Sequence, residues 1–129
     1  MSSKTILMIE DDLATCFLHR MVLESLNLNL NIQEVYDGKE AIDYLSQHTS
    51  CPDLILLDIN MPLLNGWEFL DAVAASTELC KDQAKIVILT TSLNPEDHER
   101  AQANPLVSGL IIKPLDEQSV KQVESYLLA

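Results

Sequence analysis

The sequence predicts an α/β fold in which five parallel strands alternate with five helices. Four short segments are apolar almost throughout, which is typical of strands covered on both faces. Stretches of helical periodicity separate them, and helical crossovers between parallel strands place helices on both faces of a sheet. The chain has 129 residues, about one domain with a sizeable core, and we expect residues 1–129 to form a single domain with no attached effector domain.

The expected strands follow in chain order from these apolar runs. The four uninterrupted runs are residues 5–9, 54–57, 86–89 and 110–112. A fifth run, residues 32–36, is interrupted by Gln33 and Glu34, and this half-polar pattern favours a strand at the edge of the sheet. We expect the strand order 2-1-3-4-5, which puts the first and third strands side by side.

The expected helices follow from apolar residues at helical spacing. In the first helix every fourth residue is large and apolar, at Leu13, Phe17 and Met21. The fourth helix is indicated only by its start, with Asn94 as cap and Pro95 in the first turn, and we expect it to be short and loosely held. Shorter patterns indicate the second, third and fifth helices, at Ala41, Ile42 and Leu45, at Trp67, Leu70 and Val73 after the Asn65-Gly66 turn, and at Val120, Val123 and Leu127.

The charge of the chain is strongly negative. It carries 20 acidic and 8 basic side chains, for a formal net charge of −12. Such a surface repels nucleic acid and anionic membranes, and the apolar runs are far shorter than the roughly 20 residues of a membrane helix. We therefore expect a cytoplasmic protein with no nucleic-acid partner and no membrane partner.

The cysteines and histidines give no sign of a metal or redox site. The three cysteines are odd in number and widely spaced, so we interpret them as reduced, mostly buried thiols. The three histidines do not follow strands, and we expect them at the surface. Met61 and Trp67 are interpreted as packing residues. The cysteines are Cys16, Cys51 and Cys80, and the histidines are His19, His48 and His98.

Charged and polar residues follow four of the predicted strands. Glu10 and Asp11 follow the first, Asp58 the third, Thr90 the fourth and Lys113 the fifth. Open α/β sheets bind ligands outside the carboxyl ends of their strands, at the switch point in strand order. In the order 2-1-3-4-5 these five side chains converge at one edge of the sheet.

A convergence of this kind favours magnesium-dependent phosphoryl chemistry. The carboxylates of Glu10, Asp11 and Asp58 would repel one another, and a hard cation such as Mg²⁺ removes the conflict. An ionised aspartate beside Mg²⁺ can attack a phosphoryl donor and form an aspartyl phosphate. Lys113 and Thr90 could supply the cation and the hydroxyl that the new charge requires.

Each residue also has an ordinary structural explanation. Acidic residues after the first strand suit the first turn of a helix. Asp58, which is followed four residues later by Pro62, suits a plain turn. A threonine such as Thr90 is common in strands, and a lysine such as Lys113 is usually solvated or ion-paired. The coincidence of all of them at strand ends of one fold is what favours the functional interpretation.

These motifs, in this order, resemble the receiver domain of two-component response regulators. The resemblance covers nearly the whole chain. The matching segments are ILMIEDD at residues 6–12, DLILLDINMPLLNG at 53–66, IVILTTS at 86–92 and GLIIKPL at 109–115. The resemblance implies a flavodoxin-like (βα)5 sandwich that is a phosphoacceptor rather than a conventional enzyme.

The resemblance also implies roles for individual residues. Asp58 matches the phosphoacceptor, and Glu10 and Asp11 match the acidic metal pair. Asn60 would give its backbone carbonyl to Mg²⁺. Thr90 matches the switch hydroxyl.

Lys113 matches the conserved-type lysine of the family motif, and the Lys113–Pro114 bond is then expected to be cis, a state that only X–Pro bonds reach at low cost. One departure concerns output. The residue three before the lysine, commonly aromatic in the family, is Leu110 here. We therefore expect the switch to depend on Thr90 and Lys113 rather than on an aromatic rotor.

The implied function is that of a stand-alone response regulator. It would receive a phosphoryl group on Asp58 from a histidine kinase or a histidine phosphotransfer protein and then bind an unknown downstream protein target. The alternative is an intermediate carrier in a multistep phosphorelay. A flavodoxin is disfavoured because the loop after the first strand is acidic. A haloacid-dehalogenase-type phosphatase is disfavoured because it requires a second aspartate at the position of Asn60.

Overall fold

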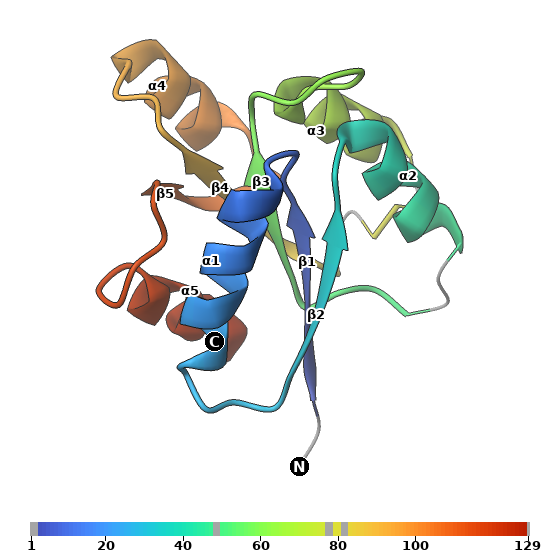
Figure 1. Cartoon of the computed structure of the whole chain (residues 1–129). Helices are drawn as coiled ribbons and strands as arrows, with labels where there is room; N and C mark the ends of the chain where they lie inside the picture. The colour runs from blue at the N-terminus through green and yellow to red at the C-terminus, as the bar shows by residue number, and fades with distance from the viewer. Residues whose placement is uncertain (1–2, 48–49, 77–78, 81–82, 129) are drawn as a thin grey trace.

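Strands and helices alternate along the chain in the computed structural model, which describes residues 3–47, 50–76, 79–80 and 83–128 (Figure 1). The strands are β1 (Lys4–Ile9), β2 (Leu30–Val35), β3 (Leu54–Asp58), β4 (Lys85–Thr90) and β5 (Val107–Ile112). The helices are α1 (Leu13–Glu24), α2 (Gly38–Gln47), α3 (Gly66–Ala75), α4 (Pro95–Ala103) and α5 (Val120–Leu128). No helix in the described ranges is long and apolar enough to cross a membrane.

The strands form one parallel sheet in the order β2-β1-β3-β4-β5, which confirms the predicted topology. The register of β1 and β3 places Ile9 opposite Leu57. Glu10 and Asp58, which follow these residues, therefore lie side by side at the carboxyl edge. On the other side of β3, β4 ends at Thr90. The topology thus gathers the acidic residues and the threonine at one edge of the sheet.

Two hydrophobic cores explain why the strands are apolar throughout. One face of the sheet packs against α2, α3 and α4, and the other packs against α1 and α5 (Figure 1). Successive residues of β3 alternate between the two cores, with Ile55 in the first and Leu56 in the second. Strand β2 lies at the edge and is only partly buried, as its half-polar sequence predicts.

Helix α1 buries a different face from the one its large apolar residues suggest. Its buried residues are Cys16, His19 and Leu23, which are spaced three and four apart. The larger stripe of Leu13, Phe17 and Met21 is exposed, at 65%, 63% and 55%. The prediction that His19 lies at the surface is therefore wrong. His98 is half-buried on α4, and His48 lies outside the described residues.

Helix α4 is held by few apolar contacts, as its composition predicts. Asn94 caps it by accepting a hydrogen bond from the Glu96 amide at 3.0 Å, and Ala101 is its buried residue. The Arg100 guanidinium also stacks on the Trp67 ring of α3, 4.3 Å from the ring centroid. Trp67 thus packs between α4 and the hydrophobic core on this face of the sheet, which agrees with its interpretation as a packing residue.

The prediction of three reduced cysteines is wrong. Cys51 and Cys80 form a disulfide, with Cα atoms 5.8 Å apart, whereas Cys16 is a free, buried thiol as expected. The two bonded cysteines precede β3 and β4, and the loops before neighbouring parallel strands converge at the amino edge of the sheet. Their sequence separation of 29 hides this proximity.

The disulfide closes a covalent loop around β3 and α3, so its removal is expected to lower stability. A cross-link over 29 residues restricts the unfolded chain by about 3 to 4 kcal/mol in the chain-entropy treatment. We predict that Cys51→Ser lowers the free energy of unfolding by about this amount in urea titrations under oxidising conditions. A dithiol reductant should lower the wild type to the same value and leave Cys51→Ser unchanged. A wild type that resists urea equally well before and after full reduction would contradict the prediction.

Candidate functional site

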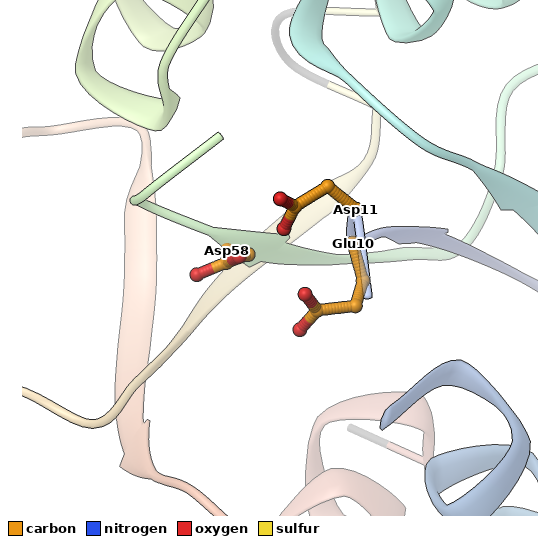
Figure 2. Close-up of side chains that lie close together, drawn as sticks. All are labelled: Glu10, Asp11 and Asp58. Atoms are coloured by element: carbon orange, nitrogen blue, oxygen red, sulfur yellow. The ribbon is translucent and has the colours of Figure 1, made fainter. Parts of the chain in front are cut away.

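The sheet brings three carboxyl groups together, as the sequence predicts. Glu10 and Asp11 follow β1, and Asp58 is the last residue of β3. One carboxylate oxygen from each lies within 4.8 Å of the other two. Figure 2 shows the three side chains gathered beside the ends of the two strands. Glu10 and Asp58 are buried, whereas Asp11 is exposed at the mouth of the cluster.

Lys113 reaches this cluster from the loop after β5. Its ammonium donates a hydrogen bond to Oε1 of Glu10, and its Nζ lies 3.3 Å from Oδ1 of Asp58. The amide of Lys113 donates to the Thr90 carbonyl at 2.8 Å, which ties the turn to the end of β4. The Lys113–Pro114 bond is cis, as predicted.

Thr90 ends β4, the neighbour of β3, and Asn60 lies two residues beyond Asp58. The Thr90 side chain is buried, and its Oγ1 accepts a hydrogen bond from the Ser92 amide at 3.0 Å. The backbone amide of Asn60 donates a hydrogen bond to Oδ1 of Asp58 at 3.3 Å. The structure therefore brings together the residues that the sequence assigns to phosphoryl and metal chemistry, although their roles stay predictions.

The charges of the site are unevenly matched. Burial and the negative charge of Glu10 raise the pKa of Asp58 to about 7. Burial alone would raise the pKa of Glu10 too, but the hydrogen bond and charge of Lys113 outweigh it and lower that pKa. Burial disfavours the charged form of Lys113, yet its bonds to Glu10 and Asp58 raise its pKa. One lysine thus faces more negative charge than it can neutralise.

This imbalance suits a hard divalent cation. Three carboxylate oxygens within 4.8 Å of one another are ligands that Mg²⁺ prefers, and they carry more charge than Lys113 offsets. The exposed position of Asp11 leaves the cluster open to solvent, so a bound ion could keep several of its waters. The donor set therefore fits Mg²⁺.

His19 is a residue of this region that the sequence reasoning missed. Its side chain is buried, and Nε2 accepts a hydrogen bond from the Leu115 amide at 3.3 Å. A cavity of about 200 Å³ separates α1 from the lysine turn, and its lining includes His19, Leu18, Lys113 and Pro114. The available signal was the spacing of His19 three residues after Cys16, but it is informative only once the buried face of α1 is known.

Comparison with known proteins assigns the family. A family model described as the response regulator receiver domain matches residues 6–123. The chain belongs to this family. Receiver domains are phosphoacceptors of two-component signalling, and they typically bind Mg²⁺ at an acidic site.

Several relatives share most of their length with this receiver. The probable methanogenesis regulatory protein FilR2 of Methanothrix harundinacea is 34% identical, over 95% of this chain and 83% of that protein. Response regulator Rcp1 of Synechocystis is 33% identical, over 73% of this chain and 66% of that protein. The phosphorylated cyanobacterial phytochrome response regulator RcpA is a solved structure with a TM-score of 0.85 and 31% identity, covering 99% of this receiver and 96% of that chain.

The raised pKa of Asp58 predicts an unusual dependence of stability on pH in the metal-free protein. Asp58 has a pKa of about 7 in the folded receiver, against 3.8 for an ordinary aspartate in water. Between these values the folded state holds a proton that the unfolded state has released, so the free energy of unfolding falls as pH rises. We predict that Asp58→Asn is more stable than wild type by roughly 1 to 3 kcal/mol at pH 8 without Mg²⁺. In urea titrations this difference should shrink towards zero near pH 4, and equal stabilities at pH 8 would refute it.

The carboxylate cluster predicts stabilisation by Mg²⁺. A free concentration ten times the dissociation constant should raise the free energy of unfolding by about 1.4 kcal/mol. Asp11→Ala should shift the Mg²⁺ dependence of urea unfolding to higher concentrations. Asp12→Asn is the matched control, because the exposed Asp12 carboxylate instead accepts a hydrogen bond from the Thr15 hydroxyl. Equal Mg²⁺ affinities in Asp11→Ala and wild type would show that the ion is held elsewhere.

Proposed function

We propose that this chain is a stand-alone response regulator that accepts a phosphoryl group on Asp58 and signals by phosphorylation-dependent protein binding. The observation that carries the proposal is the position of Asp58, which is buried beside Lys113 and within reach of Glu10 and Asp11. The receiver-domain model over residues 6–123 and the alignment over 83% of FilR2 support the assignment to receiver signalling. The donor would be a histidine kinase or a histidine phosphotransfer protein.

In the transfer step, an Asp58 carboxylate oxygen attacks the phosphorus of a phosphohistidine. A P–O bond forms as the P–N bond breaks, and the electron pair of that bond stays with the departing imidazole. Asp58 must be ionised to attack, and Lys113, 3.3 Å away, stabilises that charge. We assign Mg²⁺ to Asp58, its two acidic neighbours and the Asn60 carbonyl, where it would offset the charge of carboxylates and phosphoryl oxygens.

The signal would leave the site through Thr90. Its Oγ1 now accepts a hydrogen bond from the Ser92 amide, and the Ser92 hydroxyl donates to Asp97 at 2.6 Å. A Thr90 hydroxyl that turns to donate to phosphoryl oxygen gives up this position, so the loop before α4 must adjust. Leu110 lines a cavity of about 450 Å³ between α4 and β5, where it has no polar tip to move.

An exposed apolar face on α1 supports docking of a helical phosphodonor. This α1 apolar face comprises Leu13, Phe17, Leu18 and Met21, each more than half exposed. It begins close in sequence to Asp11, at the mouth of the acidic cluster. Leu63 and Leu93, in the loops after β3 and β4, are also exposed and lie at the same edge of the sheet. So much apolar surface around a charged site is typical of a protein interface.

Phosphorylation by a small donor tests the assignment of Asp58. We expect acetyl phosphate with Mg²⁺ to add one phosphoryl group to the wild type, detected by intact-protein mass spectrometry. Asp58→Asn should remain unlabelled, because it lacks the nucleophile, whereas the Asp12→Asn control should label like wild type. An Asp58→Asn variant that is labelled as readily as wild type would place the acceptor elsewhere.

The α1 apolar face predicts a defect that depends on the donor. The donor in this test is a phosphorylated histidine phosphotransfer protein that labels the wild type. Phe17→Ser should slow phosphoryl transfer from this donor by about tenfold, as expected for loss of an interface anchor. Labelling by acetyl phosphate should be unchanged, because this small donor does not contact the helix. Leu128→Ser, equally exposed on α5, is the matched control. If both variants transfer at the wild-type rate, the donor docks on another surface.

A further inference from the structure

His19 connects α1 to the turn that carries Lys113. The side chain is 2% exposed, and its Nε2 accepts a hydrogen bond from the Leu115 amide, 96 residues along the chain. Leu115 is two residues beyond Lys113, so the bond lies on the far side of the turn. On the near side, the Lys113 amide donates to the Thr90 carbonyl. The turn is therefore held by one backbone anchor on each side of the lysine.

Leu115 is packed in the core beside α1 and α5, but the side of the turn that carries Lys113 is less closely packed. A cavity of about 200 Å³ lies between α1 and the turn, and both His19 and Lys113 line it. On the side of this solvent-accessible pocket, the turn lacks the dense contacts that resist movement in a core, so loss of the hydrogen bond allows Lys113 to shift.

We propose that His19 is a positioning residue for Lys113: by accepting the Leu115 amide, it holds the turn so that the ammonium meets Glu10 and Asp58. The proposal rests on the proposed function, in which Lys113 stabilises the charge of Asp58 and of the transferred phosphoryl group. It gives α1 a role in the chemistry that is separate from the docking of a donor on its apolar face.

The anchor requires a neutral imidazole. A ring nitrogen that accepts a backbone N–H carries no proton, so the single ring proton of His19 lies on Nδ1. Burial lowers the pKa of His19, and the charge of Lys113 lowers it further, whereas Glu10 opposes them. The charges that act on the ring thus come from the lysine turn and from the end of β1. Protonation of Nε2 would place its N–H opposite the N–H of the Leu115 amide. Two donors cannot share a hydrogen bond, so the turn would be released.

Two substitutions distinguish the effect of the hydrogen bond at His19 from the effect of its packing. His19→Gln retains a side-chain oxygen that can accept the amide at any pH, whereas His19→Leu fills similar space with no acceptor. The rate of labelling by acetyl phosphate with saturating Mg²⁺ is measured for both from pH 5 to pH 8. Urea titrations establish that each variant is folded.

We expect His19→Gln to match the wild type within about twofold at pH 8. The ratio of its rate to the wild-type rate should rise as pH falls, because only the wild type loses its anchor. His19→Leu should label about 10- to 100-fold more slowly than the wild type at pH 8, the cost of a misplaced catalytic group, and this difference should narrow as pH falls and the wild type loses its own anchor. A folded His19→Leu that labels at the wild-type rate would overturn the proposal.

A second measurement detects the hydrogen bond between the Leu115 amide and His19 without any phosphorylation. In ¹⁵N-labelled protein, the Leu115 amide should titrate with the same midpoint as the His19 ring, and this titration should be missing in His19→Gln. If the chemical shift of the Leu115 amide does not change as His19 titrates, the proposal is wrong. If wild type and Asp58→Asn label alike, the proposed function fails, and the amide titration still decides whether His19 anchors the turn.

Discussion

The contact of one partly buried ammonium with two buried carboxylates is the constraint on which the rest of the molecule depends. Lys113 bonds Glu10 and lies 3.3 Å from Asp58, and the three groups are at least 87% buried. No short segment can assemble them, because Lys113 and Glu10 are 103 residues apart. A parallel sheet in the order β2-β1-β3-β4-β5 achieves this by placing the ends of β1 and β3 side by side. Apolar strands, two cores and four helical crossovers hold that edge in place.

The same contact explains why the site is reactive rather than merely stable. A single lysine cannot satisfy Glu10, Asp11 and Asp58 together, so burial and repulsion raise the pKa of Asp58 to about 7. The metal-free receiver is thus less stable than its cores would allow, and a cation or a proton relieves the difference. Strain of this kind is characteristic of functional sites, because the groups that a core would exclude are those that chemistry requires.

Much of this arrangement could be predicted from the sequence, since strand periodicity and the positions of Glu10, Asp58 and Lys113 depend on local patterns and on the topology of parallel sheets. Two features could not be predicted. The large residues of α1 point to solvent, so hydrophobicity indicated the wrong face and concealed the burial of His19. The disulfide joins loops that meet only after β3 and β4 pair, and nothing local to Cys51 or Cys80 reveals that meeting. Both failures concern tertiary neighbours rather than secondary structure.

The most direct test of this account is the protonation of Asp58 itself. Its carboxyl ¹³C resonance can be followed by NMR across pH 3 to 9, without Mg²⁺ and with saturating Mg²⁺, and assigned by comparison with Asp58→Asn. We expect a pKa near 7 without the ion, because burial and Glu10 oppose ionisation. We also expect a marked fall in that pKa when Mg²⁺ binds. A pKa near 4 that does not respond to Mg²⁺ would contradict the central claim that unbalanced charge at this edge of the sheet prepares Asp58 for a cation and a phosphoryl group.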